Sequence, residues 1–404
     1  MKTRTILKLS MLTLAITAAT NASANVNEKI SKAVKETKVD VSLRYRFETV
    51  DQDGVDEEAL ASTLKSRLTL TTGKIANFGA KVEADNVTYI GSDNFNNTVN
   101  GKTDHAVVAD PDGSEINQAF LQYTNKILNV TAGRQRINLD DQRFVGGVAW
   151  RQNEQTFDGY RVQLAPASIF NFDLSYVYNV NRIFGEDSAK SDLHGDIVLA
   201  NAKYKFANKQ SVSVYNYYLD FDGGAASTSS NTIGITYNGA FPIAKNTLAV
   251  KLGYADQEEV GDTAMSYSAD YSVIDAQYKF KGYSVGAGIE TLGSDGGDIG
   301  FATPLATLHK FQGFTDKFLT TPIDGLVDTY IKGSAKIGPV NVAAAYHMFE
   351  ADSGNNDYGN EINITATYKL NKQVSALVKA ASYSEDDGGY TDTNKLWFMV
   401  TANY

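Results

Sequence analysis

Arginine is the residue type whose positions in this chain point most directly to chemistry. Nine of the ten arginines lie in segment 44–182, which begins and ends with an arginine, and none lies beyond Arg182. A planar guanidinium donates two parallel hydrogen bonds to a carboxylate, so a row of such groups would attract anions and pass them on. Basic residues at the polar positions of alternating segments are candidates for such a row: Arg44, Arg46, Lys65, Arg67, Lys81 and Arg161.

Acidic residues at polar positions of the same segments give these arginines a second interpretation. Glu48, Glu83, Asp85 and Asp173 are available as partners. Ion pairs of this kind would fix loops and screen charge without selecting a solute. The sequence leaves both interpretations open, anion selectivity and structural bracing.

The elements that must position these residues are β-strands. From Val39 onward, apolar and polar residues alternate: Val41, Leu43, Tyr45 and Phe47 are separated by polar residues, and segments 170–179 and 361–370 repeat the pattern. Alternation with period two marks strands with one apolar and one polar face. No comparable stretch has apolar residues at helical spacing, so the fold is predicted to be all-β.

The connections between these strands alternate between short and long. Short turns near 73–77, 125–126, 165–168 and 371–372, among others, are separated by long polar segments such as 50–62, 137–155 and 293–325. Threading strands between them gives about 18, each near the ~10 residues that a tilted transmembrane strand needs. We therefore predict that residues 39–404 form a transmembrane antiparallel up-and-down β-barrel with short periplasmic turns and long external loops. The 23 tyrosines and 19 phenylalanines suit strands that cross two lipid interfaces.

Closure into a barrel follows because hydrocarbon offers no hydrogen-bond partners to an open sheet edge. About 18 strands enclose an aqueous lumen rather than a packed core. Loop 293–325 is long and apolar enough to fold into that lumen as a constriction, which we favour, or to cap the exterior. Arg134 and Arg136 are exceptions to the pattern, because Leu128, Val130 and Ala132 direct their positions toward lipid. Either they lie above the membrane or a bulge near Gly133 turns them inward.

The ends of the chain predict export and membrane insertion. Residues 1–24 combine basic residues, a short apolar run and a small-residue cleavage pattern, which is typical of a signal peptide. Residues 25–38 are expected to form a periplasmic tail or short helix. The apolar-alternating segment that ends at Tyr404 is expected to address the chain to the barrel-assembly machinery. The predicted location is the outer membrane of a Gram-negative cell, in contact with its lipid and lipopolysaccharide.

Composition excludes several classes of function. The chain has no cysteine and only four histidines, so disulfide scaffolds and thiolate metal sites are excluded and no metal or cofactor is predicted. A formal charge of -10 argues against a nucleic-acid partner. No histidine has a nucleophile at a telling spacing, so a barrel hydrolase is disfavoured and no enzymatic activity is predicted.

Two segments resemble the alginate-export family of Gram-negative outer-membrane porins: GRQRINLDDQRFVGGVAWRQNEQTFDG (133–159) and HKFQGFTDKFLTTPIDGLVDTYIKG (309–333). The resemblance implies an 18-stranded monomeric barrel whose electropositive pore passes an acidic polysaccharide. It places the family's arginine-rich segment on Arg134, Arg136, Arg143 and Arg151, with Asp140, Asp141 and Asp158 as candidate partners. The chain departs from the alginate exporter itself in its short length and in having no arginine in its C-terminal half.

These observations predict a porin that passes small hydrophilic, anion-leaning solutes through an arginine-lined lumen. The alternative is a dedicated export pore for an acidic, alginate-like polysaccharide. A structural or adhesive barrel is a further possibility. The sequence names neither the solute nor the oligomeric state.

Overall fold

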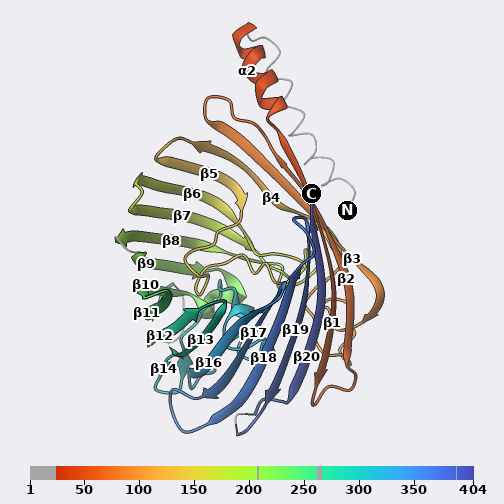
Figure 1. Cartoon of the computed structure of the whole chain (residues 1–404), viewed down its shortest axis with the longest axis vertical. Coiled ribbons are helices and arrows are strands. Elements are labelled where there is room, and N and C mark those ends of the chain that lie inside the picture. Colours follow the sequence, from red (N-terminus) through yellow and green to blue (C-terminus); the bar gives the residue numbers. More distant parts are fainter. Residues whose placement is uncertain (1–23, 207–208, 262–265, 388) are drawn as a thin grey trace.

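A computed structural model describes residues 24–206, 209–261, 266–387 and 389–404. The predicted signal peptide, residues 1–24, lies outside these ranges except for its last residue. Helix α2 (Ala24–Lys35) comes first and projects from one end of the molecule (Figure 1). None of the helices in the described ranges has the length and apolar character needed to cross a membrane.

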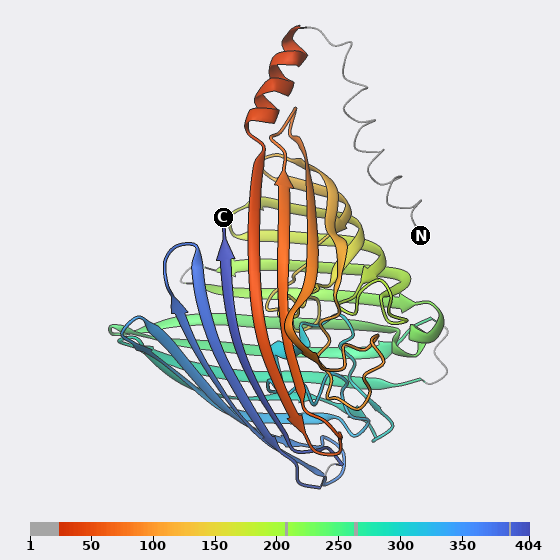
Figure 2. The same cartoon turned by 90° about the vertical axis from the view of Figure 1, so that its right-hand side faces the viewer.

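Within the described residues, one closed antiparallel sheet of 18 strands makes up the body of the molecule. β1 pairs with β2 on one side and with the last strand, β20, on the other, so the sheet has no edge (Figure 2). The predicted 18-stranded barrel is therefore confirmed. The strands are β1 (Lys38–Gln52), β2 (Ala59–Thr71), β3 (Phe78–Asn94), β4 (Gly113–Thr124), β5 (Leu128–Gln135), β6 (Thr156–Ala167), β7 (Phe170–Asn181), β8 (Asp192–Phe206), β9 (Gln210–Phe221), β10 (Ser230–Ile243), β11 (Asn246–Glu259), β12 (Ser268–Phe280), β13 (Tyr283–Leu292), β16 (Leu326–Ile337), β17 (Val340–Glu350), β18 (Asp357–Lys369), β19 (Val374–Ser384) and β20 (Thr393–Asn403).

The outer face of the barrel carries the apolar half of the alternation. Along β2, for example, Leu68 is 53% exposed whereas Lys65 is buried toward the interior. Exposed aromatic side chains lie near the short turns (Phe78, Phe170, Tyr204, Phe206 and Tyr283) and again toward the long loops (Tyr160, Tyr176, Tyr178 and Tyr254). An apolar belt between two aromatic girdles is the surface of an outer-membrane barrel.

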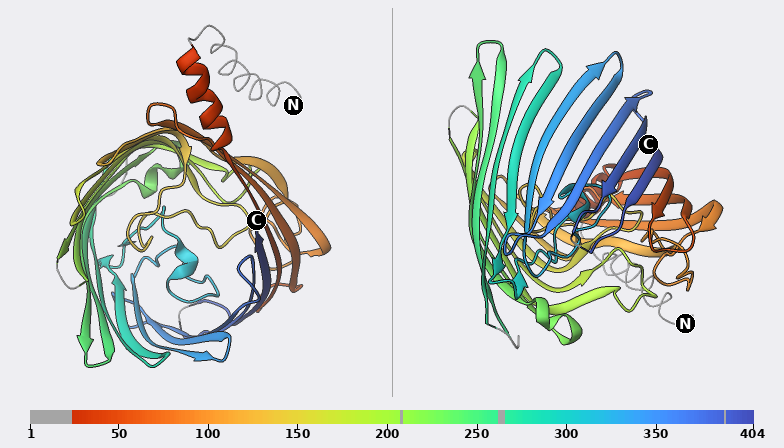
Figure 3. Two further views of the ribbon diagram at one scale, coloured as in Figure 1. Left: turned by 45° about the horizontal axis from the view of Figure 1, so that its top comes forward. Right: turned by 90° about the horizontal axis from the view of Figure 1, so that it is seen from below.

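Two long loops fold into the barrel and cross its interior (Figure 3). Loop 136–155 connects β5 to β6, and loop 301–325 connects the small hairpin β14 (Ser294–Asp295)–β15 (Ile299–Gly300) to β16. They are hydrogen-bonded to each other, with Gly146 N donating to Leu305 O at 2.9 Å and Thr307 N donating to Gln142 O at 3.1 Å. The expectation that 293–325 constricts the lumen is thus confirmed for its segment 301–325.

The β6–β7 pairing depends on a glycine. A Cβ atom at Gly159 would lie 2.1 Å from Tyr176 O and 2.9 Å from Val177 Cα, where the register between these strands shifts. Because this backbone cannot move without losing strand pairing, Gly159→Ala should destabilise the barrel by about 1–3 kcal/mol. The measurement is the urea midpoint of unfolding, followed by the mobility difference between folded and unfolded barrel on gels.

Gly333→Ala is the matched control, because its added Cβ would meet nothing closer than Ser284 O at 3.4 Å. A midpoint for Gly159→Ala equal to that of this control would contradict the proposed steric role.

Candidate functional site: the constricted lumen

Glu154, near the end of loop 136–155, is the centre of a basic cluster on the wall formed by β2 and β3. Its carboxylate lies 3.3 Å from Lys65 Nζ, 2.9 Å from Arg67 Nη2 and 2.5 Å from Arg136 Nη2. Arg67 and Arg136 also contact Glu83, at 3.5 and 2.8 Å. Burial favours the protonated carboxyl, but the three cations outweigh it and hold the pKa of Glu154 well below its usual range. The loop is therefore attached to the wall by ion pairs.

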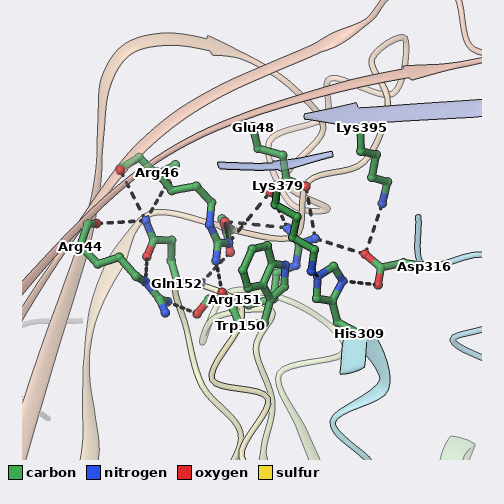
Figure 4. A network of polar contacts seen from close by, with 12 residues as sticks. Arg44, Arg46, Glu48, Trp150, Arg151, Gln152, His309, Asp316, Lys379 and Lys395 are labelled. Carbon is green, nitrogen blue, oxygen red and sulfur yellow. Dashed lines mark hydrogen bonds and ion pairs between the residues drawn. The ribbon is translucent and has the colours of Figure 1, made fainter. Parts of the chain in front are cut away.

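A second cluster attaches the same loop to β1. Arg46 is 1% exposed, donates to Asp110 at 2.9 Å and also bonds the carbonyl of Trp150. Arg151 lies 3.1 Å from Glu48 (Figure 4). It also lies 3.8 Å from Asp110. Burial opposes ionisation of Asp110, but the two arginines lower its pKa from the ordinary value.

Arg44 differs from its neighbours because it holds the loop through neutral acceptors. Its guanidinium donates to Gln152 Oε1 at 2.9 Å and to the carbonyl of Ala149 at 2.8 Å, and it also bonds the carbonyl of Arg151. These donors fix the loop backbone against the wall, where no carboxylate is needed.

The tip of loop 136–155 reaches the opposite wall. Asp140 lies 3.1 Å from Lys203 of β8, and Asp141 lies 2.6 Å from Lys251 of β11. Arg143 is buried and pairs with Glu290 of β13 at 3.0 Å. The loop therefore spans the lumen from β5 to the β8–β13 wall and returns to β1.

Loop 301–325 is attached to the C-terminal strands. Glu361 of β18 accepts hydrogen bonds from the backbone N–H groups of Phe314 and Thr315 and from the Thr315 hydroxyl. Asp316 lies 3.2 Å from Lys395 of β20 and 3.4 Å from Arg151 of the other loop. Both loops are thus held by buried charges on the wall and by each other.

The basic residues predicted from the sequence occupy four different environments, and that of Arg134 is described in the next paragraph. Arg44, Arg46, Lys65, Arg67, Arg136, Arg143 and Arg151 attach the inward loops to the wall, as described above. Arg161 faces the lumen and pairs with Asp173 at 2.6 Å. Lys81 also faces inward, and in the described residues it forms no hydrogen bond or ion pair with another side chain.

The sequence left the orientation of Arg134 and Arg136 open. In the structure the two side chains lie on opposite faces of the barrel wall. β5 ends at Gln135, so Arg136 is free of the strand alternation and turns inward to Glu83 and Glu154. Arg134 keeps the outward-facing register and forms a bidentate pair with Asp158, directly opposite on β6, at 2.8 and 3.0 Å.

The bracing acids are largely those that the sequence suggested. Glu48, Glu83, Asp85 and Asp173 all pair with arginines, and so does Asp158. Asp140 and Asp141 instead pair with lysines of the far wall.

Several of the ion pairs in the lumen expose the cation more than the acid. The side chain of Arg136 is 24% exposed, against 6% for Glu83 and 4% for Glu154. Lys203 and Lys332 are each 31% exposed, against 16% for Asp140 and 14% for Asp275. The order is reversed in Lys251–Asp141, at 19% and 39%, and by a few per cent in Arg143–Glu290 and Lys395–Asp316. At Arg136, Lys203 and Lys332, water in the lumen therefore meets the cation of the pair more than its acid.

Sequence reasoning did not select the lysines of the C-terminal half as site residues. The signal was present, because Lys203, Lys251, Lys332, Lys379 and Lys395 all occupy polar positions of alternating strands. In the described ranges no cluster of three or more histidine or acidic residues could hold a metal ion.

Comparisons with known proteins give one family match and solved structures with the same fold. A family model described as alginate export matches residues 35–282. Among solved structures, OccAB4 of Acinetobacter baumannii aligns with a TM-score of 0.73 at 14% identity, over 91% of this chain and 98% of that one. OpdK of Pseudomonas aeruginosa, solved with vanillate, aligns with a TM-score of 0.73 at 12% identity, over 92% and 99%. OpdL of the same species gives 0.69 at 14% identity, over 92% and 99%. No curated protein matches the sequence.

Proposed function

The chain belongs to the alginate export family, and we propose that it is a passive outer-membrane channel for small hydrophilic solutes with a preference for anions. The observation that carries this proposal is the unequal exposure within the lumen ion pairs of three cations. Arg136, Lys203 and Lys332 face the water more than the acids that neutralise them. An anion entering the lumen meets these cations first, while the acids lie behind them.

This arrangement suits passage rather than tight binding. Each exposed cation already has an acidic partner, so a solute carboxylate gains only a share of its charge and can leave again. The two crossing loops restrict the passage to small solutes. Vanillate, the carboxylate solved with OpdK, is a suitable test anion.

The test is the reversal potential of single channels in a planar bilayer under a salt gradient, for the wild type and for Lys203→Ala/Lys332→Ala. Removing two lumen cations should lower the anion-to-cation permeability ratio roughly two- to fivefold, as expected for partly exposed charges worth about 0.5–1 kcal/mol. Vanillate should block the wild type more strongly than the variant.

Lys32→Ala/Lys190→Ala removes the same charge from helix α2 and from an external loop. An equal loss of selectivity in this control would show that total charge, and not the lumen, sets the preference. A wild type without anion preference would refute the proposal.

The sequence also allowed a second function, a dedicated exit pore for an acidic polysaccharide. The two loops that are bonded inside the lumen disfavour it. A polymer needs a continuous wide track, whereas loops 136–155 and 301–325 cross the interior and are bonded to each other. Many of the arginines that would form the basic track are occupied as loop anchors.

Two further features of the sequence belong to this proposal. The outward apolar belt contacts membrane lipid, with lipopolysaccharide in the outer leaflet, and β20 supplies the signal for the barrel-assembly machinery.

No catalytic activity is proposed. Within the described residues, the hydrogen bonds of His309 and His347 go to Asp316, Lys379 and Asp328, and to no hydroxyl nucleophile.

A further inference from the structure

The two tryptophans of the chain meet at the point where both inward loops touch the wall. Trp150 of loop 136–155 stacks on the ring of His309 from loop 301–325, with centroids 4.5 Å apart and planes at 8°. Trp397 of β20 meets Trp150 edge-on at 5.8 Å. Figure 4 shows Trp150 and His309 at this junction, with Lys379 beside them.

Burial and the hydrogen bonds of His309 together define its protonation state. Its Nε2 lies 2.6 Å from Lys379 Nζ, and its Nδ1 lies 2.6 Å from Asp316 Oδ1. Burial lowers the pKa of the ring to about 3, so the ring is neutral near neutral pH. A carboxylate can only accept, so the ring proton lies on Nδ1 and is donated to Asp316, which leaves Nε2 to accept from Lys379.

Lys379 depends on this neutral ring. It is 5% exposed and has no carboxylate within ion-pair distance in the described residues. Apart from His309, it contacts aromatic faces, with Nζ 3.2 Å from the ring centroid of Phe314 and 4.1 Å from that of Trp150. These cation–π contacts are favourable, but Nε2 is its hydrogen-bond acceptor.

The charged groups around the ring decide what protonation would do. Asp316 faces it from its own loop, Lys379 from β19 and Arg151 from loop 136–155. Behind these lie Lys395 of β20, bonded to Asp316; Arg46 of β1, over Trp150; Glu48 of β1, bonded to Arg151; and Glu361 of β18, which holds Phe314 and Thr315. A proton on Nε2 would remove the acceptor of Lys379 and place two cations 2.6 Å apart, while the Asp316 contact would survive.

We propose that His309 is an acid-sensitive latch of the constriction. While neutral, it holds loop 301–325 to Lys379 on the wall and to Trp150 on the other loop. When protonated, it releases Lys379, and the two loops loosen in the lumen. This inference goes beyond the proposed anion channel and uses different residues.

The direction of the pH dependence follows from the burial of the ring. Burial, together with Lys379 and Arg151, lowers the pKa of His309 to about 3 against the opposite effect of Asp316. A histidine released from the junction would have a pKa of about 6.5. Because the latched state has the lower pKa, the latch is fully stable above about pH 6.5 and weakens as the pH falls from there toward about 3.

Tryptophan fluorescence reads this junction directly, because no other part of the chain contains tryptophan. The measurement is the emission of the folded barrel in detergent from about pH 7.5 to about pH 3.5, a range that spans ordinary histidine titration. The wild type should show a transition in its emission when the ring stacked on Trp150 becomes charged. The variant His309→Gln should show no such transition. Glutamine keeps a neutral donor and acceptor in the same place, and gel mobility confirms folding.

His347→Gln is the matched control, since His347 is also a lumen histidine paired with an aspartate, Asp328, at 2.9 Å. It should keep the wild-type transition. Lys379→Met removes the cation that opposes protonation, so its transition should move to higher pH, which a merely structural role for His309 would not cause. A wild-type transition retained in His309→Gln, or no transition at all, overturns the proposal.

Single-channel recording tests whether protonation of His309 loosens the two loops in the lumen. Acid should change the conductance or flicker of the wild type and leave His309→Gln unaffected. A fluorescence transition with constant conductance would refute the loosening of the constriction. Absence of conductance at every pH would instead count against the proposed channel, so the two proposals fail separately.

Discussion

Replacing Glu154 with glutamine is expected to detach the end of loop 136–155 from the β2–β3 wall. The change leaves Lys65, Arg67 and Arg136 with one carboxylate fewer, and the side chains of Lys65 and Glu154 are only 6% and 4% exposed. Removing one member of a buried ion pair costs about 3–5 kcal/mol, because the remaining charge has no counterion. Hydrogen exchange of loop peptides should show this loss as faster local opening, and the lumen should become more anion-selective.

The pH dependence of this effect has a definite sign. The folded-state pKa of Glu154 is depressed by its cationic neighbours despite burial. Its contribution is therefore present above the ordinary carboxyl pKa of about 4.3 and lost as the pH falls through the lower folded value. Wild type and Glu154→Gln should differ most near neutral pH and converge in acid.

Glu57→Gln, on an exposed external segment, removes the same charge without an ion pair and should leave both readouts unchanged. Loop exchange in Glu154→Gln that matches this control would mean that the ion pairs do not hold the loop.

The barrel was predictable because its physics is repetitive. Each strand alternates between lipid and lumen, and Val41, Leu43 and Tyr45 already give the rule that the remaining strands repeat. Lipid allows no open sheet edge, so the strand count and closure follow from the pattern without knowledge of any distant contact.

The lumen was less predictable because its contacts join residues that are far apart in sequence. Arg143 and Glu290 are separated by 147 positions, and Arg151 and Asp316 by 165. Alternation shows that a residue points inward, but not which loop will cover it. This is why the sequence could assign arginines to the inner wall or to the loop, while their role as anchors stayed one of two options.

Arg134 and Arg136 illustrate the same limit on a smaller scale. The alternation of side chains along a strand places positions 134 and 136 on the same face, because they differ by one strand period. The structure separates them because β5 stops at Gln135, and that end is set by the path of loop 136–155 across the lumen. A local pattern cannot contain this information.

Bracing and selectivity, which the sequence offered as alternatives, are compatible in this lumen. In part of the pairs the acid that braces the cation is also the more deeply buried partner, as in Arg67 with Asp85, where the side chains are 14% and 0% exposed. Pairing therefore fixes the loops, while the unequal exposure of these pairs leaves the cation toward the water. A ladder of unpaired arginines is not required.

Gly313→Ala is expected to release loop 301–325 from β18 and raise the channel conductance. Gly313 has φ +82°, and an added Cβ would lie 2.3 Å from Glu361 Oε2. The substitution therefore displaces the carboxylate that accepts from Phe314, Thr315 and the Thr315 hydroxyl. A buried carboxylate that loses its donors costs about 1–3 kcal/mol or more, in addition to about 1 kcal/mol for alanine in a left-handed conformation.

The control separates strain from contact. Gly354 has φ +90° with nothing within 4 Å of the added Cβ, so Gly354→Ala imposes the same backbone strain outside the lumen. If only Gly313→Ala raises single-channel conductance, the Glu361 contact holds the constriction, and the passage is narrow because this loop is bound inside it. Equal conductance in the two variants would mean that loop 301–325 stays in place without Glu361, held by His309, by the ion pairs of Asp316 and by its bonds to loop 136–155.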